Sequence, residues 1–142
     1  MNNPKDVAFR MVTGLHEAIF LMSNGRIGGR AGGMPVLRLT TIGRKTGKRR
    51  TTMLTSPIQD GERVILVASY GGDDRHPTWF LNLRENPQVE ITMQGRTRSV
   101  RAREATPEER AEWWPRVVAA YGPYEHYQRR TERVIPFVVL EP

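Results

Sequence analysis

The sequence predicts an α+β domain in which helices surround an antiparallel β-barrel or a strongly curled sheet. The first observation behind this prediction is the length, because 142 residues suit one domain with one hydrophobic core. The second is that about six segments have the composition of β-strands, and most of them follow one another across hairpin turns. The third is that helical patterns lie before, between and after these strands, which places the helices at the periphery.

The overall composition narrows the class of protein. The net charge is +7, and a positive excess of this size favours an anionic partner. The chain contains no cysteine, which excludes disulfides and thiolate metal sites. No apolar run is long enough for a membrane-spanning helix, and the N-terminus has no signal-peptide pattern. A cytoplasmic protein is the simplest interpretation.

Residues 5–23 have the pattern of an amphipathic helix. The apolar positions recur at three- and four-residue spacing and are Ala8, Met11, Val12, Leu15, Ile19 and Met22. Packing on the domain is the plainer interpretation of this stripe. Peripheral contact with the inner face of the membrane is the alternative, since Phe9 and Phe20 flank the stripe.

Residues 25–35 contain five glycines and predict a flexible connection, with ordering over a ligand as the alternative. We therefore expect an N-terminal segment at 1–34 and a folded β-rich domain at 35–142.

The central part of the chain carries most of the predicted strands. Their β-branched and alternating residues place strands at 36–41, 50–58, 63–69, 89–93 and 97–103. The segment 63–69 (RVILVAS) is apolar almost throughout, so we expect it to be a buried central strand. Residues 77–86 predict a short helix, because Pro87 follows its end.

The C-terminal part predicts two helices and a last strand. Thr106 and Glu109 have capping-box spacing, with Pro107 in the first turn, so a helix is expected to begin there. Its expected apolar face consists of Ala111, Trp114, Val117, Val118 and Tyr121. A second helix is expected over 124–133. The segment 134–140 (VIPFVVL) predicts a strand at an edge or bulge, because it contains Pro136.

The positive charge is concentrated in one turn, residues 43–50 (GRKTGKRR), which we call the basic turn. Five of its eight residues are cationic and none is acidic. Glycines at its two ends allow positive φ angles and a close approach to a ligand. Arg44 and Arg50 are suited to bidentate contacts with phosphate oxygens, Lys45 contributes a point charge, and Thr46 completes the cradle. A solvated charged hairpin is the alternative.

Two further groups of residues have the composition of a ligand site. The first is the corner 67–72 (VASYGG), where a strand ends in small residues and leaves space for a flat ligand beside Trp79. The second is the set Tyr121, Tyr124 and Tyr127, whose spacing of three puts the phenols on one helical face. Ordinary core packing is the alternative for Trp79, for Phe80 and for the tyrosines.

The sequence lacks the residue patterns of metal sites, nucleotide-binding loops and hydrolase triads. His16, His76 and His126 lie on separate elements without metal-ligand spacing, so no metal site is predicted. The chain contains no P-loop and no G-x-G-x-x-G motif after a strand, and no Ser/His/Asp triad is indicated.

Five segments in the same order together resemble the deazaflavin (coenzyme F420)-dependent nitroreductase family. They are TIGRKTGKRR, VASYGG, HPTWFLNLRENP, TPEERAEWWP and IPFVVLEP, and the likeness extends from about residue 35 to the C-terminus. The resemblance implies a flavin-type split β-barrel that binds coenzyme F420, with FMN as a weaker alternative. This deazaflavin carries a phosphate and an oligoglutamate tail, which agrees with the charge of the basic turn.

The resemblance also implies roles for individual residues. The phosphate end of the coenzyme would contact Arg44, Lys45, Thr46 and Arg50. The ring system would lie among Thr51, Thr52, Met53, Leu54, Thr55, Val67, Ala68, Ser69, Tyr70, Thr78, Trp79, Phe80, Leu81 and Asn82. The acceptor would lie on Tyr121, Tyr124 and Tyr127, and Ser69 would bond the acceptor or donate a proton. Two positions depart from the family pattern, since some relatives have lysine in place of Tyr70 and tyrosine near Thr55.

The expected activity is hydride transfer from the reduced deazaflavin to a quinone, an activated enone or a nitroaromatic. A basic β-barrel that binds nucleic acid without catalysis is the alternative. That alternative predicts aromatic residues among the cations, but residues 25–58 contain none, so no nucleic-acid partner is expected. The protein is expected to be a monomer or a homodimer.

Overall fold

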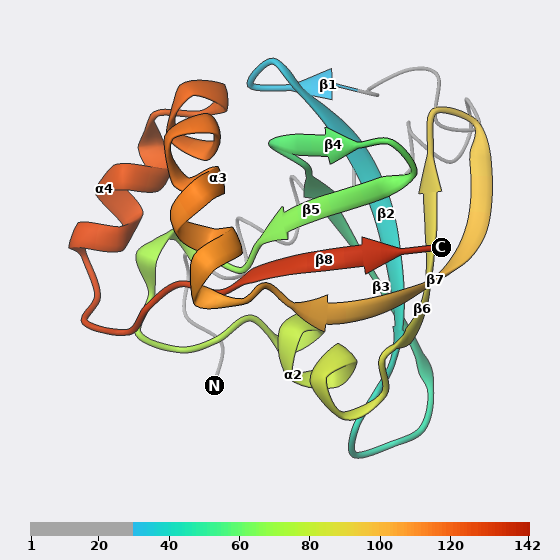
Figure 1. The fold of residues 1–142 in the computed structure, drawn as a ribbon. Helices are drawn as coiled ribbons and strands as arrows, with labels where there is room; N and C mark the ends of the chain where they lie inside the picture. The colour runs from blue at the N-terminus through green and yellow to red at the C-terminus, as the bar shows by residue number, and fades with distance from the viewer. Residues whose placement is uncertain (1–29) are drawn as a thin grey trace.

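In the computed structural model, which describes residues 30–142, eight β-strands form one antiparallel sheet that curls around a hydrophobic core (Figure 1). The strands are β1 (Arg30–Ala31), β2 (Met34–Ile42), β3 (Arg49–Thr55), β4 (Ile58–Asp60), β5 (Arg63–Val67), β6 (Gln88–Met93), β7 (Arg96–Glu104) and β8 (Phe137–Glu141). Their order is β1-β2-β6-β7-β8-β5-β4, and β3 pairs with β2. The predicted α+β class with a mostly antiparallel split barrel is confirmed.

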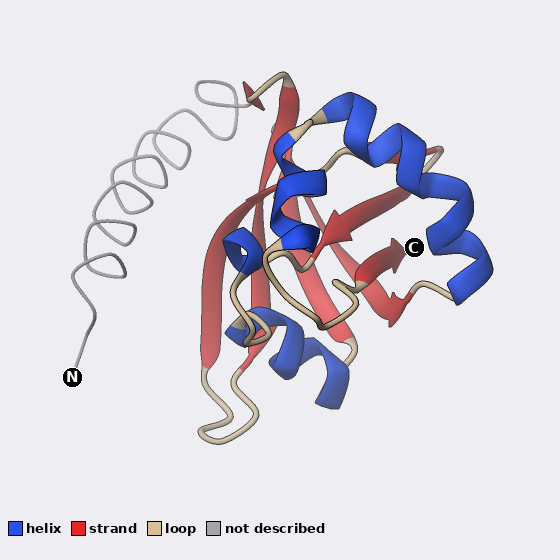
Figure 2. Ribbon diagram, turned by 90° about the vertical axis from the view of Figure 1, so that its left-hand side faces the viewer, coloured by secondary structure: helices blue, strands red, loops and turns tan. Residues whose placement is uncertain are grey.

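Four helical segments lie around the sheet in the described part of the chain (Figure 2). They are the 3₁₀ turn η1 (Tyr70–Gly72) and the helices α2 (Thr78–Glu85), α3 (Pro107–Ala120) and α4 (Pro123–Arg129). None of the helices between residues 30 and 142 combines the length and apolar composition needed to cross a membrane. The predicted helix at 5–23 lies outside the described residues.

Two strands differ from the prediction for identifiable reasons. The expected strand 50–58 is divided at Ser56, whose buried hydroxyl lies 2.8 Å from Ile58 O and 2.7 Å from Ile65 O. The last strand was expected at an edge or bulge because of Pro136, and the edge position was wrong. β8 pairs with β5 on one side and β7 on the other. Pro136 precedes the strand, where its missing N–H removes no ladder bond.

Alternate residues of β5 and β8 enter two different hydrophobic clusters. Val64, Leu66, Val138 and Leu140 pack in a cluster that also includes residues of β2, β6, β7 and α2. Ile65, Val67, Phe137 and Val139 pack in a second cluster beneath α3 and α4. Because both faces of these strands are buried, their sequences are continuous apolar runs rather than alternating ones.

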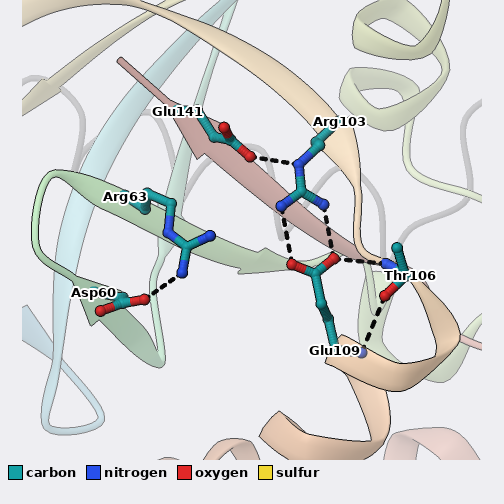
Figure 3. A network of polar contacts seen from close by, with 6 residues as sticks. All are labelled: Asp60, Arg63, Arg103, Thr106, Glu109 and Glu141. Atoms are coloured by element: carbon teal, nitrogen blue, oxygen red, sulfur yellow. Dashed lines mark hydrogen bonds and ion pairs between the residues drawn. The ribbon is translucent and has the colours of Figure 1, made fainter.

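The start of α3 is fixed by the predicted capping box and by an arginine of β7 (Figure 3). Thr106 Oγ1 accepts from the Glu109 N–H at 3.1 Å, and the Glu109 carboxylate accepts from the Thr106 N–H at 2.8 Å. Arg103 donates to both Glu109 oxygens, at 2.7 and 2.9 Å, and also pairs with Glu141.

The predicted apolar face of α3 was wrong in part. The deeply buried tryptophan is Trp113, at 5% exposure, whereas Ala111 is exposed and Trp114 is half-buried. Trp114 instead stacks on Phe137 with ring centroids 6.2 Å apart. The periodicity placed the helix correctly, but two adjacent tryptophans left the rotation of the face undetermined.

Candidate active site

The basic turn connects β2 to β3 and projects from the sheet beside α2 (Figures 1 and 2). Backbone hydrogen bonds of 2.8 Å from Gly43 N to Lys48 O and from Gly47 N to Gly43 O close it. Gly47 has a φ of 70°, as predicted. Gly43 lacks a positive φ and is needed for space instead, because a Cβ there would lie 2.8 Å from the Thr46 hydroxyl.

Asn82 of α2 holds the first residue of the basic turn's cationic run. Its Oδ1 accepts from the Arg44 backbone N–H at 3.2 Å and from the Arg44 guanidinium at 3.3 Å. Its Nδ2 donates to Thr41 Oγ1 at 3.2 Å, and Asn82 is only 2% exposed. The structure therefore makes Asn82 a buried link that orients Arg44.

Most of the turn's charge is uncompensated. Arg49 pairs with Glu90 of β6 at 3.2 Å. No carboxylate between residues 30 and 142 lies within 4.0 Å of the other four cations, Arg44, Lys45, Lys48 and Arg50. These cations lie close together along one short segment, so an anionic group bound there would reduce their mutual repulsion. The arrangement therefore suits an anionic group such as a phosphate.

β3 extends from the basic turn along one edge of the sheet. Within the described residues it pairs with β2 and with no other strand. The register places Arg50, Thr52 and Leu54 opposite Thr41, Leu39 and Leu37, while Thr51, Met53 and Thr55 alternate on the other face. A ligand along this edge would therefore contact backbone and only part of the predicted side-chain set.

The corner after β5, taken from here on as residues 68–73, contains Ser69 and, next to it, Tyr70 with a strained backbone. Ser69 is half-buried, and its hydroxyl does not cap η1. The next residue, Tyr70, is 41% exposed and has a φ of 46°, which is uncommon for a residue with a Cβ. Strained backbone of this kind occurs often at ligand sites.

The predicted ring contacts fall into buried and accessible groups. Val67, Ala68 and Phe80 are buried in the hydrophobic clusters, so their side chains are taken up by core packing. Trp79 is 9% exposed and meets Phe80 edge to face, with centroids 6.4 Å apart. Thr78 is exposed and Leu81 is half-buried on the same helix. The core interpretation of Trp79 and of Phe80 agrees with this burial.

The three tyrosines form one compact cluster, but they do not share one helix as predicted, because Tyr121 is the C-cap of α3 and Tyr124 and Tyr127 lie on α4. Their ring centroids are 5.2 Å apart for Tyr121 and Tyr124, 6.2 Å for Tyr124 and Tyr127, and 6.5 Å for Tyr121 and Tyr127. Tyr124 is buried, with its hydroxyl 3.8 Å from Met34 Sδ, whereas Tyr121 and Tyr127 are half-buried. Tyr121 and Tyr127 are therefore the more accessible phenols.

The environment raises the pKa of two of these phenols above its ordinary value. Burial raises the pKa of Tyr124, and a hydrogen bond with Thr55 offsets part of that rise. Burial, together with the Tyr121 hydroxyl, raises the pKa of Tyr127. Both phenols are O–H donors at neutral pH. The contact between Thr55 and Tyr124 also joins the end of β3 to α4.

Sequence reasoning missed the part played by the β1–β2 turn. A Cβ on Gly32 would lie 3.1 Å from the Tyr121 ring, so this turn lies directly against the tyrosine cluster. The segment 25–35 was predicted to be a flexible connection. Its described part is instead a short hairpin in which Arg30 and Ala31 pair with Pro35 and Met34.

Two hollows lie mostly outside the predicted site, although Arg49 of the basic turn lines the first of them. A hollow of about 140 Å³ lies between β2, β3, β6 and β7, and one of about 110 Å³ lies between α2 and β7. Only Phe80 of the predicted site residues lines either one. No group of three His, Asp or Glu side chains in the part of the chain that the structure describes is arranged to hold a metal ion.

Comparison with known proteins identifies the family. Residues 12–142 match the family described as F420H(2)-dependent quinone reductase. The chain belongs to this family. A F420H(2)-dependent quinone reductase of Mycobacterium tuberculosis (strain ATCC 25618 / H37Rv) is 45% identical over 130 residues, covering 89% of this chain and 87% of the relative.

Two solved structures are similar to this member of the quinone reductase family. A F420-H2 dependent reductase, FDR-A, is 39% identical with a TM-score of 0.68, covering 75% of this chain and 94% of its own. A protein described as a domain-swapped dimer is 34% identical with a TM-score of 0.71, covering 98% and 100%.

Family membership confirms the predicted recognition, enzyme class and cofactor. The protein is an oxidoreductase, and its cofactor is coenzyme F420. The comparisons give no support to a nucleic-acid-binding module. The individual contacts between the coenzyme and the predicted residues stay predictions.

Proposed function

We propose that this protein binds reduced coenzyme F420 along β3 and uses it to reduce a quinone held by the tyrosine cluster. The observation that carries this proposal is the position of β3. Its first residues lie at the basic turn, and its last residue, Thr55, pairs with Val36 of β2, the strand whose Met34 Sδ lies 3.8 Å from the Tyr124 hydroxyl. Seven strand residues span about 20 Å, a length suited to an extended cofactor.

The charged end of the coenzyme belongs at the basic turn. Arg44, oriented by Asn82, and Lys45 hold the phosphate, and Arg50 and Thr46 lie on the same turn. The outward edge of β3 and the corner at Ser69 and Tyr70 border the ring. When bound, the reduced deazaflavin supplies a hydride, and the protein's share is orientation and electrostatics.

The acceptor belongs on the half-buried phenols. Tyr121 and Tyr127 present aromatic surface and O–H groups to a flat electrophile. A quinone that gains a hydride becomes a phenolate and needs one proton. The phenols of α4 and the hydroxyl of Ser69 are the protein groups able to donate it or to stabilise the oxyanion. Enones and nitroaromatics have the same requirement for a hydrogen-bond donor and are the secondary acceptors.

The oligomeric state and the membrane contact complete the proposal. A structural relative at 34% identity is described as a domain-swapped dimer, and we propose that this protein also forms a homodimer. Light scattering after size exclusion tests the homodimer, and a monomer at micromolar concentration would refute it.

Peripheral membrane contact through residues 5–23 would favour a lipid-soluble quinone, and flotation with anionic liposomes tests this contact.

Titration with coenzyme F420, followed by oxidation of the reduced form with menadione, tests the proposed activity. We expect binding at micromolar protein and turnover that is faster with menadione than with a nitroaromatic. Binding without turnover of any quinone would contradict the acceptor assignment. An absence of binding would contradict the proposed arrangement along β3.

A further inference from the structure

Arg133 lies in the segment that connects α4 to β8, about 60 residues away from the corner it contacts. Its Nε donates to Asp73 O at 2.8 Å, its Nη2 to Ser69 O at 2.8 Å and its Nη1 to Ala68 O at 3.2 Å. One half-buried guanidinium therefore bonds three backbone carbonyls that flank η1. Only arginine has enough donors in a fixed planar arrangement to do this.

The backbone between these carbonyls is strained. Tyr70, Gly71 and Gly72 have consecutive positive φ angles of 46°, 64° and 84°. A residue with a Cβ avoids this region, so Tyr70 holds its conformation only where the surroundings impose it. The three bonds from Arg133 lie on both sides of the strained residues and supply that constraint.

The same corner packs directly on α4. A Cβ on Gly72 would lie 2.7 Å from Tyr127 O and 3.0 Å from Tyr127 Cα, so only glycine fits there. Arg130 adds a bond from Nη1 to Gly71 O at 3.0 Å, and Thr131 Oγ1 donates to Asp74 at 2.7 Å. The segment that presents the tyrosines thus also holds the corner that presents Ser69.

We propose that Arg133 is a positioning residue for the reduction: it fixes the corner 68–73, and with it the Ser69 hydroxyl, relative to the phenols of α4. The catalytic role of Arg133 rests on the proposed function. The constraint on the corner depends only on the hydrogen bonds described above. Loss of the guanidinium would let the strained backbone relax and move Ser69 away from Tyr127. The basic turn, at the opposite end of β3, would keep its hold on the coenzyme.

The test compares Arg133→Met and Arg133→Lys with Arg98→Met in the full-length protein. Arg98 is the matched control because its Nη2 also donates to a backbone carbonyl, Glu62 O at 2.7 Å, in the turn at the far end of β5. The measurements are the dissociation constant for coenzyme F420, kcat and KM with menadione, and amide exchange at Gly72 and Asp73. The N–H groups of Gly72 and Asp73 donate to Ser69 O and Tyr70 O within the corner.

For Arg133→Met we expect kcat to fall by about 10- to 100-fold, as for a small misplacement of a reacting group. Coenzyme affinity should change by less than about threefold, and both amides should exchange at least about tenfold faster. Arg133→Lys, with donors on a single nitrogen, should be intermediate, and Arg98→Met should match the wild type. An intermediate Arg133→Lys protein supports the proposal even where Arg133→Met does not fold.

A folded Arg133→Met or Arg133→Lys protein with wild-type kcat would overturn the catalytic meaning of the constraint. Unchanged exchange at Gly72 and Asp73 would overturn the constraint itself. If the wild type fails to bind coenzyme F420, the proposed function fails, while the exchange measurement still decides whether Arg133 holds the corner.

Discussion

The two ends of the proposed site are built in different ways. The basic turn is local: its residues are consecutive, its own backbone closes it, and one distant side chain, Asn82, orients it. The corner with Ser69 is assembled from segments about 60 residues apart, since Arg130, Thr131 and Arg133 hold it. A local module is suited to binding a charged group, whereas precise placement of reacting atoms needs support from several elements.

The largest effect is expected at the basic turn. Replacing Arg44 and Lys45 together with alanine should weaken coenzyme binding by about 2–5 kcal/mol, because charge-assisted contacts are lost. Turnover at saturating coenzyme should change little if the turn is a separate binding module. Titration by fluorescence measures the affinity. The double variant of exposed Arg96 and Arg101 removes the same charge from β7 and should bind normally. Equal losses of coenzyme affinity in both double variants would show that the overall positive charge, rather than the basic turn, determines the affinity.

The tyrosine cluster should show the opposite pattern. Tyr127→Phe removes a half-buried hydroxyl, so turnover should fall by about 10- to 100-fold, a range typical of a lost proton donor or hydrogen bond. Coenzyme affinity should stay within about twofold of the wild type. Tyr124→Phe should lower turnover too and also cost about 1 kcal/mol of stability, because the buried Tyr124 hydroxyl contacts Thr55. Stopped-flow kinetics measures coenzyme binding and quinone reduction separately. Weaker coenzyme binding with normal turnover would show that these phenols serve the coenzyme rather than the acceptor.

These two regions also differ in how well they could be predicted. Consecutive cations near glycines are visible in the sequence, and so is a tyrosine at every third residue from 121 to 127. The carbonyls bonded by Arg133 are not visible, because backbone acceptors leave no sequence pattern and the partners are 60 to 65 positions away. The edge position of β3 and the burial of Phe80 depend on strand order and helix rotation, which only the assembled sheet determines.

Asn82 connects the local module to the rest of the fold, so its replacement tests how independent the turn is. Asn82→Ala removes both acceptor bonds to Arg44 and should weaken coenzyme binding by about 1–1.5 kcal/mol. Asn86→Ala, an exposed asparagine at the end of the same helix, is the matched control and should bind normally. Normal binding by a folded Asn82→Ala protein would show that the turn organises itself without α2.

The smallest effect is expected at the start of α3, which lies outside both ends of the site. A hydrogen bond from Arg103 lowers the pKa of Glu109 to about 2 (Figure 3). A carboxyl with a depressed pKa stabilises the fold above its ordinary pKa near 4.5, and this contribution is lost as pH falls toward 2. Glu109→Gln should therefore lower the free energy of unfolding by about 1 kcal/mol or less at pH 7, since Glu109 is partly exposed.

The difference between Glu109→Gln and the wild type should shrink below pH 4 and vanish only below the folded-state pKa of about 2, as measured by urea unfolding across that range. Glutamine can still accept from the Thr106 N–H, so the experiment isolates the charge. Coenzyme affinity and turnover should be unchanged at pH 7, because neither Arg103 nor Glu109 belongs to the proposed site. A stability difference that is independent of pH would assign the effect to packing rather than to the Arg103 pair.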